Sequence, residues 1–229
     1  MKAIITGATK GIGKAIAIAL AKSGYDIIAC ARNAAELESF EREIKGFGVD
    51  VLAIKADCSK KEEVLAFLAK ATVFAPKVDV LVNNVGVFNP GSLLDEADEV
   101  FELQQQTNVN AAYYLSKNIG KMMREQGFGH IFNICSVASK MPVENAGSYS
   151  VTKAAMLSLN YVLRRELAPH QVKVTAIIPG STYTASWEGT SLDQAKFVQP
   201  EDVAKAVITI LDLSDGANVD ELTITPSNF

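Results

Sequence analysis

Short apolar runs alternate with amphipathic stretches along this chain. The apolar runs are rich in Ile, Val and Ala with little polar alternation, which is typical of parallel strands buried on both faces. We expect strands near residues 2–6, 26–31, 50–56, 78–83, 130–135, 172–178 and 221–225. The stretches between them carry apolar residues at helical spacing. We expect helices near residues 12–23, 34–45, 60–74, 96–126, 148–168 and 201–212.

This alternation predicts an α/β fold. Right-handed crossovers would build one doubly wound parallel sheet of about seven strands with helices on both faces. No linker or low-complexity segment divides the 229 residues, so we expect a single domain over residues 1–229. The net charge of −4 gives no electrostatic reason to expect nucleic acid or a membrane surface as a partner. No apolar run is long enough to span a bilayer, and we expect a cytoplasmic protein.

A glycine-rich loop lies between the first predicted strand and the first predicted helix. It reads Gly7-Ala8-Thr9-Lys10-Gly11-Ile12-Gly13. Glycines at this junction let the backbone turn tightly and approach a pyrophosphate, which the helix N-terminus then stabilises. The spacing is Gly-x-x-x-Gly-x-Gly rather than the commoner Gly-x-Gly-x-x-Gly. The context favours a Rossmann-type dinucleotide site over the alternative, a plain glycine turn.

Three chemically matched residues occur near the end of the fifth predicted strand and in the helix that follows. Ser136 comes directly after the strand, and Tyr149 and Lys153 share one helix face at a spacing of four. A cation beside a phenol stabilises the phenolate, which makes the phenol usable as an acid and base near neutral pH. The spacing alone is weak evidence, because Tyr113 and Lys117 have it too. We interpret that second pair as a surface pair.

The motifs taken together resemble the short-chain dehydrogenase/reductase family. The matching segments are, in order, Thr6-Gly7-Ala8-Thr9-Lys10-Gly11-Ile12-Gly13, Asn83-Asn84-Val85-Gly86, Asn108, Ser136, Tyr149-x-x-x-Lys153 and Pro179-Gly180. The resemblance implies a catalytic tetrad of Asn108, Ser136, Tyr149 and Lys153, in which Asn108 holds a water of a proton relay. Val85 departs from the usual alanine of the family.

The resemblance also implies a set of cofactor-binding residues. These are Gly7, Thr9, Lys10, Gly11, Ile12, Gly13, Arg32, Asp57, Asn84, Gly86, Tyr149, Lys153, Pro179, Gly180, Thr182 and Thr184. For Asp57 two interpretations stay open, a contact with adenine and a helix N-cap made by Asp57 or Ser59. Thr182 and Thr184 have an alternative as caps of a short helix.

The end of the second predicted strand bears on the choice of nicotinamide cofactor. An NAD site needs a carboxylate there for the ribose 2′-hydroxyl, whereas an NADP site needs a cation for the phosphate. The chain reads Ala31-Arg32-Asn33, and Asp26 lies at the opposite end of the strand. Arg32 suits a phosphate, with Lys10 as a second charge. We therefore expect NADP(H) as the cofactor.

The expected function is an NADP(H)-dependent oxidoreductase that transfers a hydride between nicotinamide and a carbonyl or alcohol substrate. A 3-oxoacyl thioester or a small ketone is the substrate class we favour, with Phe88, Met141, Val143 and Trp187 as candidate pocket residues. The alternative is a non-catalytic NADP(H)-binding regulatory protein.

We expect neither a metal site nor a disulfide framework. Cys30, Cys58 and Cys135 lack ligand spacing and are interpreted as buried, reduced thiols. The helix after Tyr149 is apolar around most of its circumference over residues 154–163. With the habit of the family, this predicts a homodimer or homotetramer.

Overall fold

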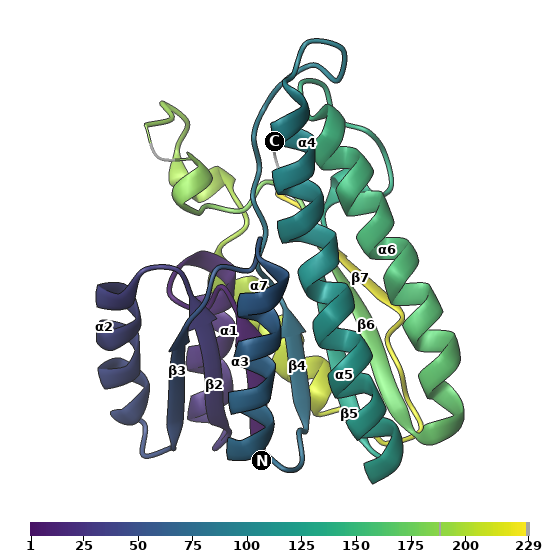
Figure 1. The fold of residues 1–229 in the computed structure, drawn as a ribbon. Coiled ribbons are helices and arrows are strands. Elements are labelled where there is room, and N and C mark those ends of the chain that lie inside the picture. Colours follow the sequence, from purple (N-terminus) through teal and green to yellow (C-terminus); the bar gives the residue numbers. More distant parts are fainter. Residues whose placement is uncertain (188, 228–229) are drawn as a thin grey trace.

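The computed structural model describes residues 1–187 and 189–227. Its strands form one parallel sheet in the order β3-β2-β1-β4-β5-β6-β7 (Figure 1). The strands are β1 Lys2–Thr6, β2 Asp26–Ala31, β3 Val51–Lys55, β4 Val80–Asn83, β5 Gly129–Ile134, β6 Val172–Pro179 and β7 Glu221–Ile224. The strand order reverses between β1 and β4, where open α/β sheets bind their ligands. The predicted fold class is confirmed.

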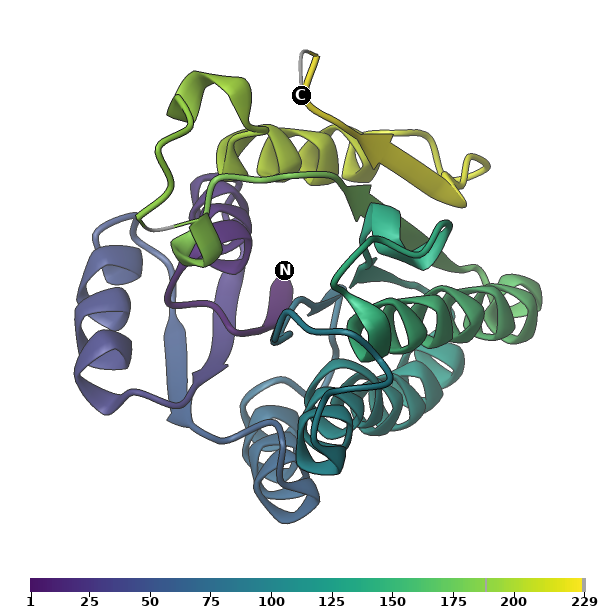
Figure 2. The ribbon, with the colours of Figure 1, turned by 90° about the horizontal axis from the view of Figure 1, so that it is seen from above.

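Helices cover both faces of the sheet (Figure 2). They are α1 Gly11–Lys22, α2 Ala34–Lys45, α3 Lys61–Phe74, α4 Asp98–Gln104, α5 Ala111–Gln126, α6 Gly147–Leu167 and α7 Pro200–Leu211. Buried side chains of α1, α2 and α7 belong to the apolar cluster on one face, and those of α3, α5 and α6 to the cluster on the other. This is the doubly wound arrangement expected from the sequence.

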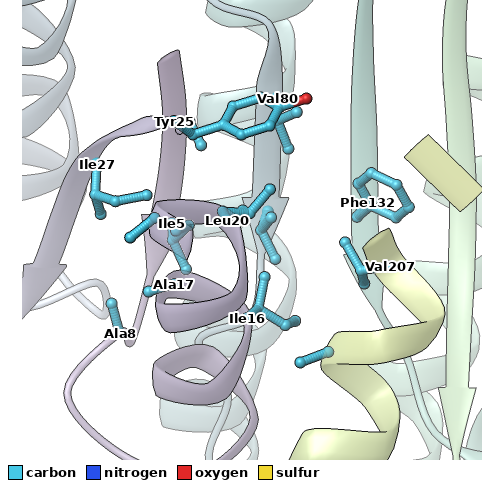
Figure 3. Close-up of a cluster of buried hydrophobic side chains, with 14 of the residues drawn as sticks. Ile5, Ala8, Ile16, Ala17, Leu20, Tyr25, Ile27, Val80, Phe132 and Val207 are labelled. Carbon is cyan, nitrogen blue, oxygen red and sulfur yellow. The ribbon is translucent and has the colours of Figure 1, made fainter. Parts of the chain in front are cut away.

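The central strands are buried on both sides because successive side chains point to opposite faces. In β1, Ala3 and Ile5 belong to one apolar cluster, whereas Ile4 belongs to the other. Ile5 packs in the same cluster as Leu20 of α1 and Val207 of α7 (Figure 3). This two-sided burial explains why the strands read as continuous apolar runs.

The helix predicted near residues 96–126 is interrupted by a π-helical segment. α4 ends at Gln104, the π-helix η1 spans Gln105–Asn110, and α5 continues from Ala111. Thr107 and Asn108 of this segment are buried although both are polar. The wider turn directs polar side chains into the fold, as π-helical segments often do at functional sites.

Two further predictions concern the state of the three cysteines and the possibility of a membrane-spanning helix. Cys30, Cys58 and Cys135 are buried, free thiols, as predicted. The Sγ atoms of Cys30 and Cys58 are 3.7 Å apart. In the part of the chain that the structure describes, no helix is both long and apolar enough to cross a bilayer.

Candidate active site

The glycine loop between β1 and α1 is fastened to the end of β4 by one side chain. Asn84 Nδ2 donates hydrogen bonds to the carbonyl oxygens of Thr6 (2.9 Å) and Gly7 (3.1 Å). Gly7 and Gly11 have φ angles of +65° and +52°, which favour glycine. A Cβ atom on Gly13 would lie 2.3 Å from Asn84 Nδ2 and 2.4 Å from the Gly7 carbonyl oxygen. The loop therefore has no room for a side chain at Gly13.

Two adjoining cavities lie over the carboxyl ends of the strands. The larger, of about 560 Å³, is lined by the predicted residues Gly7, Thr9, Lys10, Gly11, Ile12, Arg32, Asp57, Asn84, Gly86 and Thr184. The smaller, of about 300 Å³, is lined by Ile12, Asn84, Gly86, Ser136, Tyr149, Lys153, Pro179, Gly180, Thr182 and Thr184. Because Ile12, Asn84, Gly86 and Thr184 line both, the cavities form one groove from the glycine loop to Tyr149. A long ligand with phosphates at its middle suits such a groove.

The start of α6 brings Tyr149 and Lys153 to the end of β5. Lys153 Nζ lies 5.7 Å from the centre of the Tyr149 ring and donates a hydrogen bond of 2.9 Å to the carbonyl oxygen of Ile134. Ser136 follows Ile134 by two residues, and its Oγ accepts a hydrogen bond from the Ala138 N–H at 3.2 Å. Lys153 is only 5% exposed. The ammonium is thus a buried charge, held by the strand end and directed into the smaller cavity.

Asn108 is held by the loop that follows β4. Its Oδ1 accepts a hydrogen bond from the Val87 N–H at 2.7 Å, and its Nδ2 donates to the Val87 carbonyl oxygen at 3.0 Å and to Thr152 Oγ1 at 3.1 Å. A Cβ atom on Gly86 would lie 3.3 Å from Asn108 Oδ1 and 3.6 Å from Lys153 Nζ. Asn108 and Lys153 therefore both lie against Gly86, and both N–H groups of the Asn108 side-chain amide donate within the protein.

The family comparison agrees with this arrangement. The profile of a family described as short chain dehydrogenase matches residues 1–195. The chain belongs to the short-chain dehydrogenase family. An uncharacterized oxidoreductase from Staphylococcus haemolyticus (strain JCSC1435) is 31% identical over 224 residues, which cover 98% of this chain and 96% of the relative. The protein is accordingly an oxidoreductase.

Solved structures of other short-chain dehydrogenases have the same fold. An alcohol dehydrogenase from the archaeon Thermococcus sibiricus, complexed with 5-hydroxy-NADP, superposes with a TM-score of 0.91 at 29% identity, covering 100% of this chain and 97% of that one. L-sorbose reductase from Gluconobacter frateurii, complexed with NADPH and L-sorbose, has a TM-score of 0.90 at 27% identity, covering 98% and 94%. The likeness thus extends over the whole groove.

One wall of the smaller cavity is apolar. Phe88, Val143 and Trp187 line it, as expected for this short-chain dehydrogenase. The Phe88 ring meets the Tyr149 ring edge to face at a centroid distance of 4.9 Å. Met141 was expected in this wall but is 73% exposed. Burial raises the pKa of the neighbouring Cys135 thiol to about 11, so it is a neutral thiol rather than a nucleophile.

Beyond β6, the chain returns over the glycine loop. A Cβ atom on Gly11 would lie 3.1 Å from Thr184 Cγ2. Thr182 Oγ1 donates a hydrogen bond of 3.0 Å to the Gly180 carbonyl oxygen. Thr184 thus lies over the glycine loop, where the two cavities meet.

Asp57 both lines the larger cavity and shapes the turn before α3. Its Oδ1 accepts hydrogen bonds from the Ser59 N–H (3.0 Å) and hydroxyl (2.8 Å). Burial raises the pKa of Asp57, but these hydrogen bonds and the charges of Arg32 and Lys60 outweigh it, so the pKa is lowered. Lys60 is the N-cap residue of α3. The alternative that Asp57 or Ser59 is the N-cap is wrong.

Sequence reasoning missed Glu36, in the first turn of α2. The Glu36 carboxylate lines the larger cavity and accepts hydrogen bonds from Asn33 Nδ2 (3.1 Å) and Thr9 Oγ1 (3.2 Å). It also pairs with Lys10 Nζ at 2.9 Å, and the hydrogen bond from Lys10 is the main cause that lowers the pKa of Glu36. The available signal was the Asn33-x-x-Glu36 spacing, because Asn33 Oδ1 caps the helix.

Proposed function

We propose that this short-chain dehydrogenase transfers a hydride between NADP(H) and the carbon of a carbonyl or alcohol substrate. The observation that carries the proposal is the continuous groove, with a glycine cradle at one end and the Tyr149–Lys153 pair at the other. The complexes of two structural relatives, one with 5-hydroxy-NADP and one with NADPH, support the choice of cofactor.

The groove fits a nicotinamide dinucleotide. Gly13 has no room for a Cβ atom, and Gly86 leaves only 3.3 Å between such an atom and Asn108 Oδ1. Gly7, Gly11 and Gly86 line the cavities themselves, so a ligand can approach the backbone closely at these glycines, as a pyrophosphate and a ribose require. The residues that would hold the cofactor are Gly7, Thr9, Lys10, Gly11, Ile12, Gly13, Arg32, Asp57, Asn84, Gly86, Tyr149, Lys153, Pro179, Gly180, Thr182 and Thr184. The bound nicotinamide supplies or accepts the hydride.

The chain's own residues would supply the proton chemistry. Ser136 donates a hydrogen bond to the substrate oxygen, and Tyr149 gives that oxygen its proton in the direction of reduction. Lys153 stabilises the resulting phenolate, which is favourable because its ammonium is buried nearby. Asn108 holds a water molecule that connects the buried Lys153 ammonium to solvent, so that protons can be exchanged. In the direction of oxidation the same groups act in reverse.

The substrate we propose is a small uncharged ketone or a 3-oxoacyl thioester. The cavity beside Tyr149 holds about 300 Å³, and Phe88, Val143 and Trp187 make its outer wall apolar. Among the described residues that line this cavity, Lys153 is the only one with a charged side chain. An apolar wall favours carbonyl compounds whose substituents are also apolar.

We also propose that the protein is a cytoplasmic homodimer or homotetramer. Val151, Tyr161 and Val162 on α6 are 49%, 47% and 49% exposed. Apolar side chains on the outside of one helix are expected where a second subunit covers it.

Oxidation of NADPH, followed by absorbance across a panel of ketones, aldehydes and 3-oxoacyl thioesters, tests the proposed function. NADH serves as the paired cofactor in each assay. We expect turnover with at least one apolar ketone. Tight NADPH binding without turnover of any substrate would instead support the non-catalytic regulator, an alternative that neither the family nor the groove favours.

A further inference from the structure

The end of the groove next to Arg32 contains opposing charges. Lys10 and Arg32 line the larger cavity together with the carboxylate of Glu36. The sequence has no acid at the end of β2, but Glu36 of α2, five residues after Ala31, places a carboxylate at this cavity. A 2′-phosphate placed here would therefore meet a carboxylate as well as the cations.

Hydrogen bonds on both oxygens hold the Glu36 carboxylate in place. Oε1 accepts from Lys10 Nζ (2.9 Å) and Asn33 Nδ2 (3.1 Å), and Oε2 accepts from Thr9 Oγ1 (3.2 Å). Asn33 is itself fixed, because its Oδ1 caps α2. Three donors from two segments thus hold the carboxylate at the cavity wall, and the side chain is 31% exposed.

This arrangement has a charge consequence for the two cofactors. A phosphate carries about −1.5 to −2 charges near neutral pH, so it is repelled by a carboxylate and competes with it for Lys10. The 2′-hydroxyl of NAD(H) is neutral, so Glu36 does not repel it and it does not compete with Glu36 for Lys10. In the part of the chain that the structure describes, Arg32 forms no ion pair with Glu36, and it is the second cation that lines this cavity.

We infer that Glu36 is a specificity-determining residue that weakens the preference for NADP(H) over NAD(H) by engaging Lys10 and opposing the 2′-phosphate. The inference rests on the proposed function, since it assumes that a nicotinamide cofactor occupies this groove. It assigns phosphate recognition mainly to Arg32. Lys10 would contribute to phosphate binding only when its ion pair with Glu36 is broken.

Nucleotide binding to Glu36→Gln tests this inference without any substrate. Glutamine keeps the shape of the side chain and removes its charge. We expect the dissociation constant of NADPH, measured by fluorescence titration, to fall about three- to tenfold, because exposed charge pairs contribute modestly. The constant of NADH should stay unchanged. Raising the ionic strength should reduce the gain.

Glu41→Gln is the matched control, because Glu41 lies on the same helix and pairs with Lys45 at 2.6 Å. It removes one negative charge from α2 at a position that does not line the larger cavity. We expect no change in either dissociation constant. A similar gain in Glu41→Gln would show a general charge effect and overturn the inference.

Lys10→Met, alone and combined with Glu36→Gln, tests whether the tighter NADPH binding of Glu36→Gln depends on Lys10. In the double variant, the increase in NADPH affinity caused by Glu36→Gln should be largely lost. The part that remains would come from removing the repulsion between Glu36 and the 2′-phosphate. Weaker NADPH binding in Glu36→Gln, an unchanged NADPH/NADH ratio, or a shift that comes only from weaker NADH binding would each overturn the inference. Failure of the wild-type protein to bind either nucleotide would instead overturn the proposed function.

Discussion

Lys153 Nζ lies 5.7 Å from the centre of the Tyr149 ring. Lys117 Nζ lies at the same distance of 5.7 Å from the centre of the Tyr113 ring. The spacing of four on a helix thus produces one geometry in both places. The two pairs differ in burial. Tyr113 is 45% exposed on the surface, whereas Tyr149 is half-buried and its partner Lys153 is 5% exposed. The Tyr149–Lys153 pair lines the smaller cavity, where the proposed acid/base chemistry would meet a substrate.

Replacing Tyr149 with phenylalanine removes the proposed proton donor and keeps the ring that packs on Phe88. We expect kcat for NADPH-dependent reduction to fall about 10²- to 10⁴-fold, as for loss of a general acid. The dissociation constant of NADPH should change little. Tyr113→Phe removes the other hydroxyl of the same spacing and should keep full activity. Turnover retained in Tyr149→Phe would refute the acid/base role.

Replacing Arg32 with alanine tests phosphate recognition directly. Loss of a charge-assisted hydrogen bond to a phosphate should weaken NADPH binding about tenfold or more, with little effect on NADH. Fluorescence titration of both nucleotides measures this difference. Arg42→Ala, in the last turn of α2, is the control and should leave both affinities unchanged. Equal losses for NADPH and NADH in Arg32→Ala would mean that Arg32 does not contact the phosphate.

A side chain at Gly13 should disrupt the cradle. The added Cβ atom would lie 2.3 Å from Asn84 Nδ2 and 2.4 Å from a backbone oxygen, closer than real Cβ contacts come. We expect Gly13→Ala to lower the free energy of unfolding by about 1–3 kcal/mol, as overpacking does, and to weaken binding of both nucleotides. Urea denaturation measures the first effect.

Gly216→Ala is the matched control for Gly13→Ala, because a Cβ atom there would meet nothing within 4 Å. We expect its stability and nucleotide affinities to match those of the wild type. If Gly13→Ala behaved like this control, the cradle would be less tightly packed than the contacts of Asn84 indicate.

Stability should fall in mild acid because of His130. Burial, with a smaller effect from the charge of Lys173, lowers the pKa of His130 to about 3. Between the ordinary histidine pKa near 6.5 and that value, the unfolded chain binds a proton that the folded protein does not. The free energy of unfolding should therefore decrease as pH falls from about 6.5 to 4.5, by up to ~1.4 kcal/mol per pH unit.

His130→Asn should flatten this dependence in urea denaturation measured at several pH values. The imidazole contacts Thr175 Oγ1 at 2.8 Å, so the variant is expected to be less stable near neutrality, and the slope is the decisive quantity. His170 is the other histidine of the chain and is exposed, so His170→Asn should keep the wild-type slope. An unchanged slope in His130→Asn would assign the acid sensitivity to other groups.

Much of the fold was predictable from local sequence. The strands are apolar because both faces are buried, so their positions follow from composition over a few residues. The glycine loop, Ser136 and the Tyr149–Lys153 spacing were equally visible, since each depends on neighbours in the chain or on a strand end. What these features predict is that a phosphate cradle and an acid/base pair exist; their proposed roles await the variants above.

The rest depended on contacts between distant segments. Asn84 bonds Gly7 of the glycine loop across 77 residues, and Thr9 bonds Glu36 across 27. The pattern of residues 96–126 predicts one helix, but the π-helical turn that carries Asn108 forms where that side chain bonds the backbone of Val87. The sequence by itself thus determined the sheet, the glycine loop and the Tyr149–Lys153 pair, because each is encoded by local spacing. Only the tertiary structure decided which charges share the groove, because side chains from separate loops and helices meet there only after the sheet has assembled.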